Sequence, residues 1–167
     1  MRIWVPLFLG LAFFLAGPVG DASEQRGELI LIKGPLLEVD TFPPTPSCDS
    51  FFDVHRGNDR PNLFDYRHVH CQGRYTFTLR GRPGSTLTLF GKIDFGKERG
   101  FLIVRKRDDL LIWVDDLEGI PANHWVSREA KDGYGAYDAF YAQAPLFSQN
   151  IASVKWGQWW TGDPPGS

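Results

Sequence analysis

Two stretches in the middle of the chain alternate between apolar and polar positions. In residues 75–79 (YTFTL) three apolar residues alternate with two threonines, and in residues 86–93 (TLTLFGKI) the leucines keep the same period of two. Successive side chains of a strand point to opposite faces, and aromatic and β-branched residues favour strands. The pattern therefore predicts two strands, each with one buried face, joined by a turn at residues 81–84 (GRPG).

The next two apolar stretches are continuous rather than alternating. They are residues 101–104 (FLIV) and 110–114 (LLIWV), and Arg107, Asp108 and Asp109 lie between them. A short continuous apolar run is typical of a strand that is covered on both faces. With the two strands before them, these runs predict four consecutive strands joined by short turns, which is an antiparallel meander.

Further strands are predicted toward both ends of the chain. Residues 27–33 (GELILIK) and 36–39 (LLEV) flank a Gly-Pro break, residues 51–55 (FFDVH) read as a short edge strand, and residues 151–160 (IASVKWGQWW) read as a closing strand. Short strands at turn spacing with little helix predict an all-β fold, mainly antiparallel, as a β-sandwich or a small partly open barrel.

Only two pieces of the chain are compatible with helix. Residues 127–131 (SREAK) start with a serine and carry an acidic third position, as a capped helical turn does, and Asp132-Gly133 would end that turn. Residues 137–144 (YDAFYAQA) would form a second helical piece that ends at Pro145.

The N-terminus has the layout of a secretory signal peptide. Arg2 precedes an apolar run over residues 3–16, and the small residues Gly20 and Ala22 stand at the positions expected before a cleavage site. The run is shorter than the roughly 18 to 20 apolar residues needed to cross a bilayer, so no stable membrane span is expected after cleavage. We therefore expect a signal peptide over residues 1–22 and a secreted or periplasmic protein.

The remainder has the size and composition of one domain. We expect a single β-rich domain over residues 23–160 and a flexible tail over residues 161–167, which are polar and rich in proline and glycine. The hydrophobic content of 43% is sufficient for a packed core, and the formal net charge of -2 predicts no general attraction to nucleic acid or to membranes.

Two cysteines occur in the chain, Cys48 and Cys71. Export would place them in an oxidising compartment, where a disulfide is the expected state. On the chain-entropy argument such a bond would contribute roughly 3 kcal/mol. It would also restrain the proline-rich segment between residues 41 and 67, which also contains Gly57, Asn58 and Asn62.

Three histidines form a candidate metal site. His68 and His70 stand on alternate positions beside Cys71, so in a strand both imidazoles would share a face, and His55 could supply a third nitrogen. Copper and zinc accept imidazole ligands. A disulfide would remove Cys71 from the ligand set, however, because metals bind the thiolate.

Basic residues are concentrated in the central strands. Residues 74–107 hold nine lysines and arginines against two acidic residues, and the candidates for a partner surface are Arg80, Arg82, Arg105 and Arg107. Such a face could bind an anionic partner. Alternatively, these side chains stand at strand ends and turns, where charge discourages edge pairing and neighbouring acidic residues neutralise it.

Tryptophans are concentrated toward the C-terminus, at Trp125, Trp156, Trp159 and Trp160. If residues 151–160 form one strand, Trp156 and Trp160 face one way and Trp159 the other. Exposed tryptophans could stack on sugars or anchor a protein partner. The alternative is that most of these rings belong to the core.

No catalytic signature occurs in the sequence. The composition and the candidate surfaces instead predict an exported, non-catalytic binding or accessory protein that engages a protein partner or a glycan through an aromatic and basic surface. The alternatives are copper or zinc binding through His55, His68 and His70, and a small hydrolase that uses the carboxylates near Asp115 and Asp116.

Overall fold

The structure is a computed structural model that describes residues 27–34, 50–55, 57–63 and 73–165, with the side chains of residues 50–53 excepted. Several predictions fall outside these residues. They are the signal peptide over residues 1–22, the strand at 36–39, the pairing of Cys48 with Cys71, and the positions of His68 and His70. Within the described residues no helix is long and apolar enough to span a membrane.

The first of two antiparallel sheets contains four strands. They are β1 (Glu28–Lys33), β2 (Ser50–His55), β3 (Tyr75–Arg80) and β6 (Ile112–Val114), in the order β2-β1-β3-β6. The register sets Leu29 opposite Leu79 and Leu31 opposite Phe77. Because residues that face each other across an antiparallel pair share a side of the sheet, these four side chains form one apolar face.

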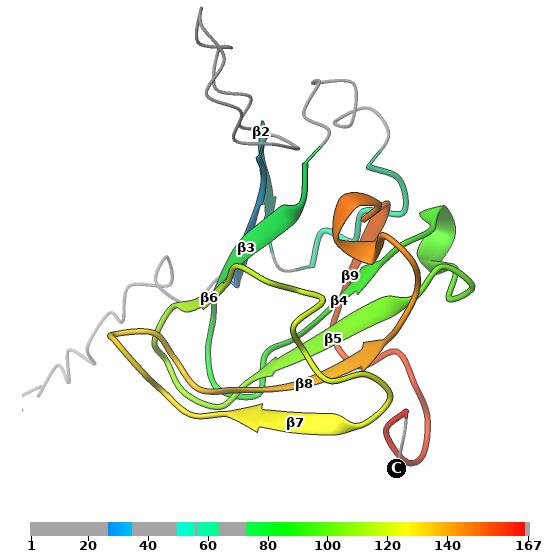
Figure 1. Cartoon of the computed structure of the whole chain (residues 1–167). Helices are drawn as coiled ribbons and strands as arrows, with labels where there is room; N and C mark the ends of the chain where they lie inside the picture. The colour runs from blue at the N-terminus through cyan, green and yellow to red at the C-terminus, as the bar shows by residue number, and fades with distance from the viewer. Residues whose placement is uncertain (1–26, 35–49, 56, 64–72, 166–167) are drawn as a thin grey trace, which may run out of the picture.

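The second sheet contains five strands. They are β4 (Thr86–Phe90), β5 (Phe101–Lys106), β7 (Trp125–Arg128), β8 (Tyr137–Ala142) and β9 (Ser153–Trp156), in the order β7-β8-β5-β4-β9. Two short 3-10 helices, η2 (Ile93–Phe95) and η3 (Phe147–Gln149), lie in the connections. The strands of the two sheets run at a steep angle to each other (Figure 1).

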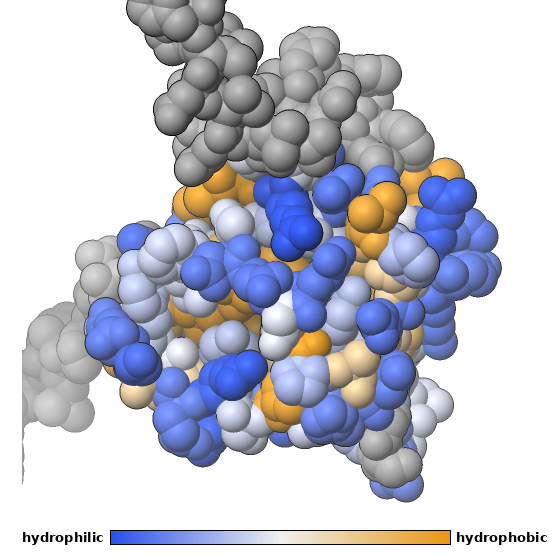
Figure 2. Space-filling model, in the orientation of Figure 1, coloured by the Kyte–Doolittle hydropathy of each residue, from blue (hydrophilic) through white to orange (hydrophobic). Residues whose placement is uncertain are grey.

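Both sheets contribute to one hydrophobic core. The apolar face of the first sheet joins Leu87 and Leu89 of β4, Leu102 and Val104 of β5, and Val154 of β9, all fully buried. Burial of one such side chain stabilises the fold by about 1.5 to 3 kcal/mol. Figure 2 shows one face of the molecular surface, where hydrophilic residues cover most of the area and hydrophobic ones show only in patches. The prediction of an all-β, antiparallel fold is confirmed.

The second sheet also carries an apolar cluster on its other face, away from the core. We call it the outer aromatic cluster. Its buried members are Phe90, Phe101, Ile103 and Phe140, and its partly buried members are Phe95, Trp125, Ala142, Trp159 and Trp160. As a result β5 is covered on both faces, as its continuous apolar run predicts.

The predicted four-stranded meander is wrong, because the chain crosses between the sheets after β3 and again after β5. The turn after β3 bonds to β5 instead of leading back along β3. The amide of Gly84 donates to the carbonyl of Lys106 at 2.8 Å, and the amide of Lys106 donates to Ser85 at 2.9 Å. Alternation identifies the buried face of a strand, but it does not tell whether the next strand lies beside it or across the core.

Both predicted helical pieces are wrong. Residues 125–128 and 137–142 form the antiparallel strands β7 and β8, and the bridge between Lys131 and Tyr134 continues their register. Asp132 and Gly133, which were expected to end a helix, have φ of 53° and 83°. Two central residues with positive φ make the tight hairpin turn that Asp-Gly favours.

The closing strand is shorter than predicted. β9 ends at Trp156, and Gly157 follows with φ of 78°, a conformation that glycine adopts without strain. The turn releases the last residues from strand parity. Trp159 and Trp160 therefore both reach the outer aromatic cluster, whereas Trp156 points into the core and is 8% exposed.

Candidate functional site

The described part of the predicted histidine site is a single residue. His55 ends β2, opposite Glu28, and is exposed. Among the described residues no group of three histidine, cysteine, aspartate or glutamate side chains could hold a metal ion. Whether His68 and His70 lie near His55 is outside the described residues, and the copper or zinc hypothesis stays a prediction.

Three of the four predicted tryptophans come together on the outer face of the second sheet. Trp159 contacts Phe101 edge-on with ring centroids 5.6 Å apart, and it meets Trp160 at the same distance. Trp160 in turn lies 6.4 Å from Trp125. The C-terminal segment thus runs from β9 back across the sheet to the start of β7 (Figure 1).

Hydrogen bonds fix these rings in place. The indole nitrogen of Trp159 donates to the hydroxyl of Thr88 at 2.8 Å, and that of Trp125 donates to the carbonyl of Pro165 at 3.0 Å. The rings therefore pack on their own sheet, and their polar edges already have partners. The outer aromatic cluster is in large part a second, smaller core.

The predicted arginines are mostly paired with carboxylates. Arg105 donates to Asp138 at 2.8 Å and stacks 5.5 Å from the Trp125 ring, and Arg107 pairs with Glu129 at 2.6 Å. Arg80, at the end of β3, lies 3.9 Å from Glu28. Arg82, in the turn between β3 and β4, is exposed. Three of these four arginines therefore lie beside a neutralising carboxylate, as the second of the two interpretations of the basic residues predicts.

Asp138 is the centre of this charged network. Its partial burial raises the carboxyl pKa, but hydrogen bonds from Arg105 and Ser127 and the charge of Arg107 outweigh burial and lower the pKa below its ordinary value. Glu129 raises the pKa of Arg107 through their hydrogen bond. These groups are engaged with one another.

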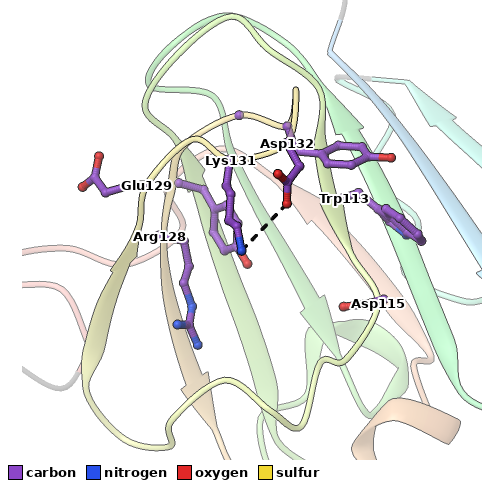
Figure 3. A pocket seen from close by; sticks show the side chains of 9 residues that line it. Trp113, Asp115, Arg128, Glu129, Lys131 and Asp132 are labelled. Carbon is purple, nitrogen blue, oxygen red and sulfur yellow. Dashed lines mark ion pairs between the residues drawn. The ribbon is translucent and has the colours of Figure 1, made fainter.

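A pocket of about 350 Å³ opens where β6, an edge of the first sheet, approaches the hairpin between β7 and β8. We call it the hairpin pocket (Figure 3). Its lining residues are Trp113, Asp115, Arg128, Glu129, Lys131, Asp132, Tyr134, Gly135 and Tyr137. Of the described residues that the sequence suggested for function, Asp115 alone lines this pocket.

Trp113 forms the aromatic wall of the hairpin pocket. Ile112 and Val114 of β6 point into the core, so Trp113 between them points outward and is 47% exposed. Its ring lies against Tyr134, with centroids 5.3 Å apart and planes tilted by 53°. Trp113 and Tyr134 thus form an aromatic pair with an exposed ring face. The continuous apolar run of residues 110–114 had instead predicted that β6 is covered on both faces.

Backbone contacts hold the hairpin against β6. The amide of Gly135 donates to Leu111 at 2.8 Å, and the carboxylate of Asp108 accepts from the amides of Leu110 and Ala136 at 3.0 and 2.6 Å. A Cβ on Gly135 would lie 2.7 Å from the carbonyl of Leu110, so only glycine fits. This close approach positions Tyr134 beside Trp113.

The charged lining residues differ in how they are engaged. The carboxylate of Glu129 is bound by Arg107, and in Figure 3 it points away from the pocket. Lys131 and Asp132 form a long, exposed pair at 3.8 Å. For Arg128 and Asp115, by contrast, the described residues provide no ion pair and no side-chain hydrogen bond.

Tyr137 adds a hydroxyl to the hairpin pocket. Burial raises its pKa above the ordinary value, the charge of Arg128 lowers it, and the charge of Asp115 raises it again. The hydroxyl is therefore protonated at neutral pH and can both donate and accept a hydrogen bond.

Sequence signals for this site were present but were interpreted differently. The Asp-Gly pair between two runs of β-forming residues is a hairpin signal, and it would have brought Arg128 and Tyr137 together on neighbouring strands. The exposure of Trp113 follows from its parity with the buried Ile112 and Val114. No sequence signal indicates that β6 approaches this hairpin.

The carboxylates of the hydrolase hypothesis are separated. Asp115 lines the hairpin pocket, and Asp116 does not. Asp132 is the other carboxylate that lies beside the pocket in Figure 3. No protein-family model, no curated protein and no solved structure matches this chain. The function must therefore be argued from the site itself.

Proposed function

We propose that the protein is an exported, non-catalytic glycan-binding protein and that the hairpin pocket is its binding site. The observation that carries this proposal is the exposed Trp113 paired with Tyr134, beside Arg128 and Asp115, for which the described residues provide no ion pair. The sequence predicted that the protein binds either a protein partner or a glycan, and we retain glycan binding. We place the binding site in the hairpin pocket instead of the outer aromatic cluster.

An aromatic ring with a free face suits one surface of a sugar ring. The apolar C–H groups of a pyranose can lie on the ring face of Trp113, which brings a large apolar area with little loss of side-chain freedom. In the outer aromatic cluster, by contrast, Trp159 and Trp160 cover other aromatic rings. The hairpin pocket instead combines a concavity with the 47% exposed ring of Trp113.

Hydroxyl groups need polar partners at the rim of such a ring. Asp115 can accept hydrogen bonds from two neighbouring hydroxyls, Arg128 can donate, and the Tyr137 hydroxyl can do both. The volume of about 350 Å³ lies within the ordinary range for small-ligand sites. A few placed polar groups around an apolar wall are what orients a ligand in such sites.

The proposal is tested by calorimetric titration of the mature protein with a panel of mono- and oligosaccharides. We expect Trp113→Ala to weaken binding of the best ligand at least about tenfold, which is a loss of about 1.4 kcal/mol. The matched control is Leu110→Ala, because Leu110 is 49% exposed, just before β6, and does not line the pocket.

Two results would contradict the proposal. One is that no sugar of the panel binds, and the other is that Trp113→Ala binds as the unchanged protein does. If binding instead falls with Trp125→Ala and not with Trp113→Ala, the outer aromatic cluster is the binding surface.

Export and the disulfide between Cys48 and Cys71 are part of the same proposal. An oxidised pair would join the segment just before β2 to the segment between β2 and β3, and would so close a loop that contains β2. Alkylation of the unreduced protein and mass spectrometry should find no free thiol, and alkylation after reduction should find two. Two free thiols in protein recovered from the exported fraction would remove the disulfide.

A further inference from the structure

The two sides of the hairpin pocket carry different chemistry. Trp113 and Asp115 come from β6 and the residue after it, and Arg128 and Lys131 come from β7 and the hairpin. In Figure 3 Asp115 and Trp113 lie on one side of the pocket and Arg128 on the other. One wall is therefore aromatic and acidic, and the opposite wall carries the cations Arg128 and Lys131 together with the carboxylates of Glu129 and Asp132. We call this second wall the basic wall, because Glu129 is bound by Arg107 and Asp132 is held only by a long pair.

The positive charge of the basic wall is not cancelled by the nearest carboxylate. Successive residues of a strand point to opposite faces, so Arg128 and Glu129 diverge, and Arg107 binds Glu129 at 2.6 Å. Asp138, on the neighbouring strand, is bound by Arg105. Glu129 and Asp138, the acidic residues adjacent to Arg128 in the chain and on the paired strand, are thus bound by other arginines.

A guanidinium without a partner recognises a carboxylate specifically. Its planar set of donors matches the two carboxylate oxygens and forms two parallel hydrogen bonds. Lys131 adds a second cation, because its pair with Asp132 is long and both side chains are about four-fifths exposed. Asp115, on the opposite wall, would repel an anion and instead accept hydrogen bonds from hydroxyls. Because the cations and Asp115 stand on opposite walls, they fix the orientation in which an acidic sugar would bind.

We infer that the hairpin pocket selects a uronic acid unit of a glycan. The sugar ring lies on Trp113, its carboxylate binds Arg128 with Lys131 beside it, and its hydroxyls bind Asp115 and Tyr137. The inference rests on the proposed function and adds the class of sugar.

The test compares sugars that differ in one group. Methyl β-D-glucuronide and methyl β-D-glucoside share every ring substituent except the carboxylate, which the glucoside replaces with a hydroxymethyl group, and the corresponding galacto pair tests the other common configuration. Calorimetry on the mature protein should show at least tenfold tighter binding of the acid in one of the two pairs.

The preference should depend on Arg128. We expect Arg128→Gln to reduce affinity for the acid about tenfold while affinity for the neutral sugar stays within about twofold. Arg128→Lys should retain part of the preference. The control is Arg82→Gln, an exposed arginine outside the pocket, which should change neither affinity. Thermal unfolding of each variant checks that the fold is intact.

Each remaining outcome decides between the two proposals. Equal affinity for acid and neutral sugar, with binding lost in Trp113→Ala, overturns the uronic acid inference and supports glycan binding. A preference that survives in Arg128→Gln and in the double variant with Lys131→Gln places the carboxylate elsewhere and also overturns the inference. If no sugar binds, both proposals fail.

Discussion

The carboxylate of Asp138 connects three side chains on the outer face of the second sheet. It accepts hydrogen bonds from Arg105 at 2.8 Å and from Ser127 at 2.7 Å, and Arg107 lies 3.9 Å away. These contacts favour the charged form more strongly than partial burial opposes it, so the pKa in the folded state is lowered. Asp138 is the described residue whose charge most clearly links stability to pH.

The sign of that dependence follows from the lowered pKa. The stabilisation is complete above the unfolded pKa of about 3.9 and is lost as pH falls through the lower, folded value. We expect Asp138→Asn to reduce the free energy of unfolding by about 1 kcal/mol at pH 7, a value that allows for screening around the partly exposed Arg105. The difference from the unchanged protein should shrink as the pH falls below the unfolded pKa and through the lower, folded one.

Urea unfolding at several pH values measures this effect. Asp163→Asn is the control, because Asp163 is exposed near the C-terminus and has no side-chain partner among the described residues. A difference between Asp138→Asn and the unchanged protein that does not shrink as the pH falls below the unfolded pKa would contradict the assignment.

At the scale of elements, the hairpin between β7 and β8 depends on one close contact. Gly135 lies against the Leu110 carbonyl and the Asp108 carboxylate, so any side chain would push the hairpin away from β6. We expect Gly135→Ala to destabilise the fold by about 1 to 3 kcal/mol, as overpacking does. It should also weaken sugar binding, because Tyr134 would lose its position beside Trp113.

Gly133→Asn is the matched control for the hairpin. Gly133 has φ of 83° and open space around it, and asparagine tolerates that conformation better than other residues with a side chain. Thermal unfolding and calorimetry of both variants make the comparison. If Gly135→Ala unfolds at the same temperature as the unchanged protein, the contact does not position the hairpin.

The C-terminal segment after β9 is the other element with a clear structural role. Trp159 covers Phe90 and Phe101, and Trp160 covers Trp125. We expect removal of residues 158–167 to destabilise the protein by about 2 to 4 kcal/mol, since partly buried aromatic rings are lost. The exposed outer face should then bind a hydrophobic dye such as ANS.

A shorter truncation isolates the aromatic contribution. Removal of residues 162–167 keeps both tryptophans and removes the Pro165 carbonyl that accepts from Trp125, so we expect a smaller loss of about 0.5 to 1.5 kcal/mol. Chemical unfolding curves measure both values. Equal losses for the two truncations would show that the rings contribute nothing.

Element by element, the sequence predicted the strands better than the helices. The strands at residues 75–79, 86–90 and 101–104 follow from apolar patterns that a sheet imposes directly. The error at 127–131 arose because Ser127 and Glu129 match a helix start, although the Asp-Gly turn after them is better satisfied by a hairpin. The helix-start pattern and the hairpin pattern are equally strong in the local sequence. Pairing with β8 decides in favour of the strand, and local sequence does not encode that contact.

At the scale of the whole molecule, sequence reasoning identified the fold class but not the path of the chain. The meander prediction assumed that consecutive strands are neighbours, whereas β3 and β4 lie in different sheets. The hairpin pocket depends on that path, because it lies where edge strands of both sheets meet. The outward direction of Trp113 was deducible from its neighbours, but its proximity to Tyr134 was not.

The shared core predicts that the two sheets unfold together. Leu29 and Phe77 of one sheet pack in the same cluster as Leu89 and Leu102 of the other, so neither sheet keeps its core-facing side buried without the other. We expect circular dichroism of the strands and tryptophan fluorescence to follow one coincident transition in urea. Two separate transitions would mean that the sheets are independent units.

The crossing of the chain between sheets also orders events during synthesis. β6 completes the first sheet, yet the ribosome makes it only after β4 and β5 of the second sheet. The opposite wall of the hairpin pocket comes later still, with β7 and β8. Strands β1, β2 and β3 must therefore remain without β6 until β4 and β5 have been made. The pairing of β3 with β6 is non-local, and such pairing is slow. The hairpin pocket, which is the proposed ligand site, can therefore form only after β8 has been synthesised.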